Sequence, residues 1–125
     1  MKVLIIEDID YIKERINSYL SNIKDIDIKE VSESARVREF LKTESFDIII
    51  TEVYVKGISA LEINHLAHKK NPDCCVIIIT TIDNADIAQK AVKEGAFDFI
   101  IRPAQLEKLE KLIKLYINVR YSPNM

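Results

Sequence analysis

The sequence predicts an α/β fold built on a doubly wound parallel sheet, and three observations support this prediction. Four short apolar runs, rich in β-branched residues, recur along the 125 residues. Each run is almost continuously apolar, as expected of strands that are covered on both faces. Segments with the apolar spacing of amphipathic helices separate the runs. Strand and helix therefore alternate along the chain, which favours right-handed crossovers and helices on both faces of the sheet.

Five strands are predicted in this alternation. The apolar runs cover residues 3–6, 48–50, 76–79 and 97–101, and an alternating segment at 26–31 suits a sheet edge. Five parallel strands joined by helices predict the flavodoxin-like (βα)5 arrangement with strand order 2-1-3-4-5.

The helix starts are predicted from side chains that accept hydrogen bonds from a first helical turn. Asp10, Ser34, Ser59 and Asp83 each precede a run with helical apolar spacing, and a strongly amphipathic segment covers 106–117.

Helix ends and chain boundaries are predicted from the same sequence. Asn71-Pro72 should end the third helix, and Gly95 suits the left-handed position just past the fourth. We expect residues 1–120 to form one domain and residues 121–125 to form a frayed tail.

Composition narrows the functions open to the chain. Only two glycines, Gly57 and Gly95, are present and far apart, which excludes dinucleotide-binding and P-loop motifs. A net charge of −2 without a basic block argues against nucleic-acid contact.

Adjacent Cys74 and Cys75 are expected to be buried hydrophobes on opposite strand faces in a reducing compartment. With no membrane-length apolar run and no signal peptide apparent, we expect a cytoplasmic protein without membrane contact.

Polar residues follow the apolar runs at what should be one rim of the sheet. They are Glu7-Asp8, Thr51-Glu52, Thr80-Thr81 and Arg102-Pro103. Open parallel sheets bind ligands beyond the carboxyl ends of their strands. Clustered carboxylates need a cation or protons to coexist, so a hard divalent ion or a basic side chain is expected between them. A single polar residue at the end of a strand is expected at any protein surface. The interpretation therefore rests on the occurrence of acids, hydroxyls and an arginine together at one rim.

Four segments, taken in their order along the chain, resemble the receiver domain of two-component response regulators, and the resemblance covers essentially the whole chain. The matching segments are K-V-L-I-I-E-D at 2–8, F-D-I-I-I-T-E-V-Y-V-K-G-I-S-A-L-E at 46–62, V-I-I-I-T-T at 76–81 and E-G-A-F-D-F-I-I-R-P at 94–103. The resemblance implies a non-enzymatic module of phosphorelay signal transduction. It also implies a protein partner, either a histidine kinase or a downstream effector, or a homodimer. The implied contact face comprises the helix after Asp83, the strand 97–101 and the helix 106–117.

The resemblance also implies roles for the rim residues. Glu7 and Asp8 stand where paired acids hold Mg²⁺, to which the backbone carbonyl of Tyr54 adds an oxygen. Thr80 stands where a hydroxyl bonds the phosphoryl oxygens, and Phe99 stands at the aromatic switch position. A cis peptide bond between Arg102 and Pro103 is implied as well.

Three departures from the family pattern define the functional hypothesis. Glu52 replaces the phosphoacceptor Asp, Arg102 replaces a Lys, and Lys56 and Ala60 replace a Pro and a Gly. The Glu carboxylate reaches about 1.5 Å further than that of Asp. Because phosphoryl transfer depends on in-line positioning, we predict that ordinary aspartyl phosphorylation is absent or very weak.

Arg102 leads to two further expectations. A guanidinium binds a carboxylate bidentately, so we predict a Glu52–Arg102 ion pair that holds the domain in one state. The longer Glu52 side chain, engaged by Arg102, should also weaken Mg²⁺ binding, because Mg²⁺ requires tight octahedral coordination.

Other functions stay open at this stage. The chain could be a static docking scaffold, or a conventional Mg²⁺-dependent phosphoreceiver with residual activity. Asp8-Ile9-Asp10 also resembles the D-x-D motif of haloacid-dehalogenase-type phosphohydrolases, although Ile12 stands where that family has a Thr. A flavodoxin-type flavin site is disfavoured, because the acids after the first strand would repel a phosphate.

Overall fold

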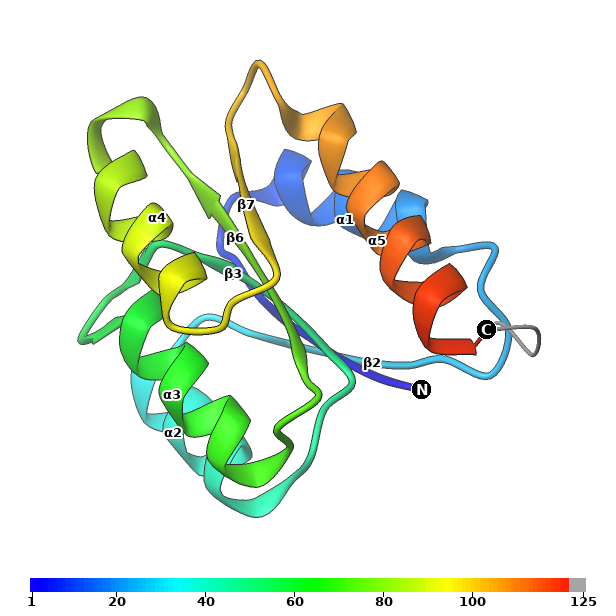
Figure 1. Cartoon of the computed structure of the whole chain (residues 1–125), viewed down its shortest axis with the longest axis horizontal. Helices are drawn as coiled ribbons and strands as arrows, with labels where there is room; N and C mark the ends of the chain where they lie inside the picture. Colours follow the sequence, from blue (N-terminus) through cyan, green and yellow to red (C-terminus); the bar gives the residue numbers. More distant parts are fainter. Residues whose placement is uncertain (122–125) are drawn as a thin grey trace.

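The computed structural model describes residues 1–121 and contains a five-stranded parallel sheet with helices on both faces (Figure 1). The strand order is β2-β1-β3-β6-β7, which confirms the predicted flavodoxin-like order once a separate two-stranded hairpin is set aside. The elements in chain order are β1 (Lys2–Ile6), α1 (Asp10–Leu20), β2 (Asp27–Val31), α2 (Ser34–Thr43), β3 (Ile48–Glu52), β4 (Tyr54–Val55), β5 (Ile58–Ser59), α3 (Ala60–Lys70), β6 (Cys75–Thr80), the 3₁₀ turn η1 (Ile82–Asn84), α4 (Ala85–Lys93), β7 (Asp98–Ile101) and α5 (Leu106–Tyr121).

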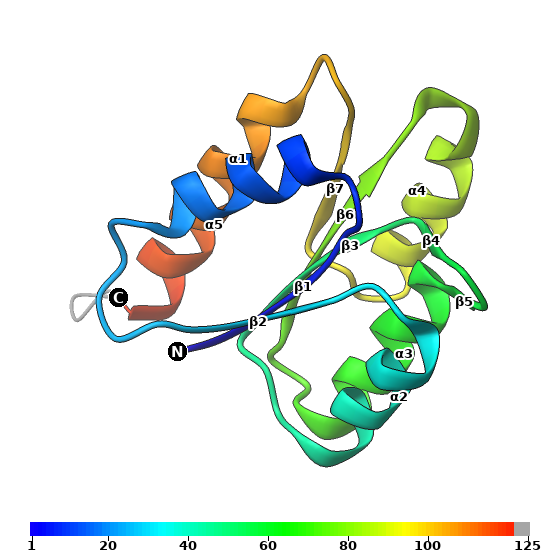
Figure 2. The same cartoon turned by 180° about the vertical axis from the view of Figure 1, so that it is seen from behind.

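The two faces of the sheet carry separate hydrophobic cores. Helices α1 and α5 cover one face and α2, α3 and α4 cover the other (Figures 1 and 2). Successive strand residues point to opposite faces, so in β1 Leu4 packs with the α2–α4 core and Ile5 with the α1–α5 core. Burial on both faces explains why the strands are continuously apolar.

The two cysteines follow the same alternation. Cys74 and Cys75 are both buried, unpaired and assigned to opposite cores, as predicted. Burial raises the pKa of the Cys74 thiol to about 12 and that of Cys75 further still. Because the thiolate is the reactive form, both side chains behave as small inert hydrophobes.

Three of the four predicted N-caps are wrong. Asp10 and Ser34 are the first residues of their helices rather than caps, and Asp83 lies inside η1. Residue type alone cannot separate a cap from a first-turn position, where Asp10 still interacts favourably with the helix dipole. Ser59 is confirmed as a cap, because its hydroxyl accepts the Glu62 backbone N–H at 3.3 Å.

The predicted helix ends agree better with the structure. Helix α3 ends at Lys70, before Asn71-Pro72, and Gly95 follows α4 with a φ of 110°. Helix α5 continues to Tyr121, one residue into the predicted tail, and residues 122–125 of that tail lie outside the described residues. None of the described helices has the length and apolar character needed to span a bilayer.

Replacing the one confirmed cap should cost measurable stability. Ser59→Ala removes the acceptor of the Glu62 N–H and is expected to lower the free energy of unfolding by about 1 kcal/mol. Urea unfolding followed by circular dichroism measures this loss, with the exposed Ser45→Ala as the matched control. Equal stability of the two variants would show that the Ser59 cap contributes nothing.

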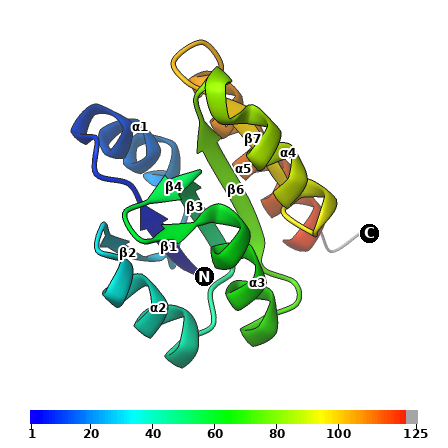
Figure 3. The same cartoon turned by 90° about the vertical axis from the view of Figure 1, so that its left-hand side faces the viewer.

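The hairpin β4–β5 between β3 and α3 was not predicted (Figure 3). Its turn contains Gly57 at a φ of 89°, where an added Cβ would lie 3.0 Å from the Ser34 hydroxyl. Arg38 of α2 donates to the Gly57 carbonyl at 2.7 Å and forms a two-point ion pair with Glu62 at 2.9 and 3.1 Å. The loop that follows β3 is therefore held against α2.

Candidate functional site

An acidic cluster lies beyond the carboxyl ends of β1 and β3. The two strands are adjacent, with Ile6 opposite Thr51, so the acids that follow them are brought together. One carboxylate oxygen from each of Glu7, Asp8 and Glu52 lies within 4.8 Å of the others. The sequence prediction that these three residues share one rim agrees with this geometry.

Glu7 is the most constrained member of the cluster. Its residue exposure is 2%, and its Oε2 accepts the backbone N–H groups of Asp8 and Ile9 at 3.1 and 3.2 Å. Its Oε1 is buried and has no N–H donor among the described residues, but the Glu52 carboxyl is hydrogen-bonded to Glu7. A proton held between the two carboxyls offsets part of the cost of burying them.

Protonation of the cluster follows from burial and like charge. Burial, together with the charges of Glu7 and Asp8, raises the pKa of Glu52 to about 8. Burial also raises the pKa of Glu7, although its backbone hydrogen bonds oppose the change. Arg102 acts in the opposite direction on Glu52 and is outweighed. At neutral pH the cluster therefore retains a proton, as expected when carboxyls are close together.

A pocket next to the acids contains the other predicted site residues. It has a volume of about 140 Å³, and Glu52, Tyr54, Thr80 and Arg102 all line it. Thr80 is buried, and its hydroxyl donates to the Thr81 carbonyl at 2.9 Å. The Arg102 backbone N–H donates to the Thr80 carbonyl at 2.8 Å. Adjacent β6 and β7 thus bring the hydroxyl and the guanidinium to the same wall.

The predicted Glu52–Arg102 ion pair is wrong. The two side chains line one pocket, but no nitrogen–oxygen distance of 4.0 Å or less joins them, and every ion pair found among residues 1–121 involves other residues. Glu52 lies with Glu7 and Asp8 instead, where it keeps its proton at neutral pH. The strand order places residue 52 beside the acids that follow β1, and burial among these acids raises the pKa of Glu52 despite the opposing charge of Arg102.

The remaining predicted site features have clear positions. Phe99 is half-buried on β7, opposite Ile78, and packs against the α2–α4 core. The Arg102–Pro103 bond is cis, as the resemblance implies. Asp10, the second acid of the D-x-D alternative, lies outside the acidic cluster and pairs with Lys13 at 3.4 Å.

The donor set fits a hard divalent cation. Oxygens at opposite vertices of an Mg²⁺ octahedron are about 4.2 Å apart, twice the usual Mg–O distance of about 2.1 Å. One oxygen from each of Glu7, Asp8 and Glu52 lies within 4.8 Å of the others, so the cluster is compact enough for all three to approach one ion after a small adjustment. These three residues would hold the ion, with Tyr54 on the pocket wall beside them. The proton on Glu52 must leave first, so binding should weaken as the pH falls.

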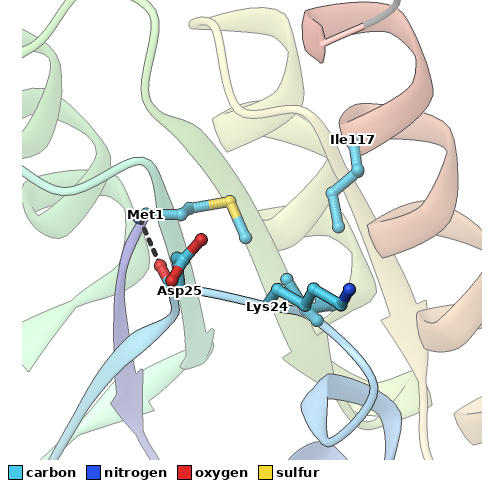
Figure 4. A pocket seen from close by; sticks show the side chains of 5 residues that line it. Met1, Lys24, Asp25 and Ile117 are labelled. Atoms are coloured by element: carbon cyan, nitrogen blue, oxygen red, sulfur yellow. Dashed lines mark hydrogen bonds between the residues drawn. The ribbon is translucent and has the colours of Figure 1, made fainter.

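A second cavity lies at the opposite end of the sheet, beside the amino end of β1 (Figure 4). It has a volume of about 290 Å³ and is lined by Met1, Ile23, Lys24, Asp25 and Ile117. The terminal ammonium donates to the Asp25 carbonyl at 2.9 Å. The sequence analysis did not predict this cavity, and Asp25, which lines it, adopts a left-handed backbone conformation with a φ of 56°. Its lining is largely apolar and offers no cluster of catalytic groups.

Comparison with known proteins gives a consistent result. The family model described as response regulator receiver domain matches residues 3–114. A cyclic di-GMP phosphodiesterase of Thermotoga maritima is 34% identical over 87% of this chain and 29% of its own length. The response regulator protein PilR of Pseudomonas aeruginosa is 30% identical over 95% of this chain and 26% of its own length. The chain thus spans between about a quarter and a third of these relatives.

The solved structures agree with the sequence relatives. The crystal structure of a response regulator receiver domain protein from Clostridium thermocellum is 30% identical, with a TM-score of 0.77 and 95% of each chain covered. The signal receiver domain of a Bacteroides fragilis response regulator is 20% identical with a TM-score of 0.75, and it supports the fold alone.

Proposed function

Since this chain belongs to the response regulator receiver domain family of two-component signalling, we propose that it is an atypical receiver that signals through protein contacts without ordinary aspartyl phosphorylation. The observation that carries the proposal is the state of Glu52. This residue occupies the phosphoacceptor position, yet its carboxyl is drawn into the cluster with Glu7 and Asp8.

Glu52 is poorly suited to accept a phosphoryl group for two reasons. Its pKa of about 8 leaves the carboxyl largely protonated at neutral pH, and a protonated carboxyl is a weak nucleophile. Its additional methylene also moves the oxygens by about 1.5 Å from the position that an Asp carboxylate would take. In-line transfer tolerates little misplacement, so both effects reduce phosphorylation.

A divalent cation would supply charge neutralisation for the transferred phosphoryl group, and Glu7, Asp8 and Glu52 would hold it. Two backbone N–H groups donate to the Oε2 of Glu7, which fixes the orientation of this carboxylate in the cluster. Thr80 and Arg102 line the adjacent pocket and could hydrogen-bond phosphoryl oxygens. The acids and the Thr80 hydroxyl match the family pattern, whereas Glu52 and Arg102 depart from it.

The direct test is exposure of the wild-type chain to acetyl phosphate and Mg²⁺, followed by intact mass. We expect no added phosphate, because Glu52 is displaced and protonated. Stoichiometric addition of phosphate that disappears in Glu52→Gln would overturn the proposal and favour a conventional receiver.

For the partner we propose a histidine kinase, a downstream effector or a second copy on the α4, β7 and α5 face. Exposed apolar side chains support this surface, since Phe97 is 38% exposed and Val119 is 57% exposed. Phe97 packs edge-on against Tyr116 of α5, and Lys108 pairs with Asp98 of β7 at 3.6 Å. These contacts join α5 to β7 in one continuous surface.

A further inference from the structure

Helix α4 is connected to its neighbour α3 by one buried side chain. The two helices lie side by side on the same face of the sheet (Figure 1). Asn64 of α3 is 2% exposed, and its Nδ2 donates to the backbone carbonyl of Glu94, the residue that follows α4, at 3.1 Å. Among residues 1–121, no other side chain forms a hydrogen bond or an ion pair with residues 85–94.

The apolar packing of α4 restrains its position only weakly. The buried residues of α4 are two alanines, Ala88 and Ala91, and α3 contributes Ala67 to the same core. Methyl groups form shallow ridges, so close packing alone distinguishes poorly between neighbouring positions of one helix along another. A hydrogen bond has a defined length and direction, and Asn64 therefore supplies the restraint that the alanines lack.

The two ends of α4 are held differently. At the carboxyl end, Gly95 has a φ of 110° and its N–H donates to the Val92 carbonyl at 3.1 Å, which closes the helix. Gly95 also lies close to α3, since a Cβ at this residue would be 3.5 Å from the His68 ring. At the amino end, Asn84 provides no side-chain cap. The carboxyl end, which Asn64 contacts, is therefore the anchored end of α4.

Asn64 contributes little to stability for a side chain so deeply buried. Its Oδ1 is buried and has no hydrogen-bond partner among the described residues. An unpartnered buried acceptor is unfavourable, and it offsets much of what the hydrogen bond to Glu94 contributes. Glu94 is exposed, so water can bond its carbonyl when the amide is absent. The effect of the amide is therefore expected in the placement of α4 and not in the overall stability.

We propose that Asn64 is a positioning residue that fixes α4 in one position on α3 and thereby sets the shape of the α4, β7 and α5 face. This assignment rests on the proposed function, because a receiver that signals through protein contacts without phosphorylation needs a partner face of constant shape. Packed helices shift by sliding along one another, and a shift of α4 would change the outline of that face. Asn64 opposes such a shift from the far side of the helix pair, without touching the partner.

The test is amide hydrogen exchange of the full chain, measured by NMR, with Asn64→Leu as the variant. Leucine has a similar shape and cannot donate a hydrogen bond. Relative to the amides of β6, we expect those of Val92 and Gly95 to exchange about five-fold faster than in the wild type, because one hydrogen bond no longer holds this end of α4. The signals of α4 should also broaden as the helix moves between neighbouring positions. The urea midpoint should be unchanged or higher.

Two further variants separate placement from stability. Ile63→Val removes one buried methyl group from the same helix and leaves Asn64 in place. It should lower the urea midpoint without any selective change at α4. Asn64→Ala removes the amide without the bulk of leucine and should show the same selective exchange as Asn64→Leu.

Three outcomes would overturn the assignment. They are wild-type exchange at α4 in both Asn64 variants, a uniform acceleration through the whole chain with a lower urea midpoint, and loss of folding in both variants. The last two would show that Asn64 serves stability alone. Failure here is distinguishable from failure of the proposed function, because the acetyl phosphate experiment reports covalent modification and the exchange experiment contains no phosphodonor.

Discussion

Glu52→Asp is expected to convert the chain from one that takes up no phosphate to one that accepts it from acetyl phosphate with Mg²⁺. The shorter side chain withdraws the carboxyl by about 1.5 Å. This change restores the acceptor position and weakens the contact with Glu7 that favours the protonated form. Glu7, Asp8 and Thr80 remain in place to hold the cation and the phosphoryl oxygens. Intact mass of the treated variant measures the gain.

The controls for this experiment separate the acceptor from its surroundings. Glu52→Gln should take up no phosphate, and Asp8→Asn added to Glu52→Asp should abolish the gain by removing one of the acids that holds the cation. A folded Glu52→Asp variant that stays unmodified would show that residue 52 is not the block. The remaining departures, Arg102, Lys56 and Ala60, would then prevent transfer.

The strand positions were predictable because burial on both faces of the sheet leaves a direct mark in the sequence. The continuous run Val76 to Ile79 lies in β6, every residue of which is buried. The short hairpin β4–β5 was not predictable, because each of its strands has two residues and no periodicity. The hairpin is held by Arg38 of α2, which contacts Gly57 in the hairpin turn and Glu62 in α3. Tertiary contacts of this kind leave no local pattern.

The sequence analysis predicted which residues form the site, but it was wrong about one contact, the Glu52–Arg102 ion pair. Strand order alone brings Glu7, Asp8 and Glu52 to one rim, so their proximity followed from the topology. The choice between Arg102 and Glu7 as the neighbour of Glu52 depends on side-chain burial and protonation. Charge pairing of ionised groups favours Arg102, whereas a buried carboxyl that keeps its proton can lie against another acid. Residue types do not contain that information.

Glu52→Gln is expected to stabilise the folded chain at alkaline pH and to change its stability little near pH 4. The pKa of Glu52 is about 8 in the folded chain against an ordinary value of 4.5. Between these values the folded chain holds a proton that the unfolded chain has released, so the stability of the wild type falls as the pH rises. Because the carboxyl is only partly shielded from solvent, the full shift overstates the effect, and we expect about 1–2 kcal/mol. Urea unfolding across this range measures it.

The sign of this dependence distinguishes a protonated cluster from an ion pair. If Glu52 were paired with Arg102, its folded pKa would lie below 4.5, and Glu52→Gln would lose stability at neutral and alkaline pH. A protonated Glu52 requires the opposite result, because glutamine keeps the shape of the neutral acid and cannot ionise beside Glu7. The exposed Glu14→Gln should show no such trend and serves as the control. A Glu52→Gln variant less stable than the wild type at about pH 9 would therefore restore the ion pair and reject the protonated cluster.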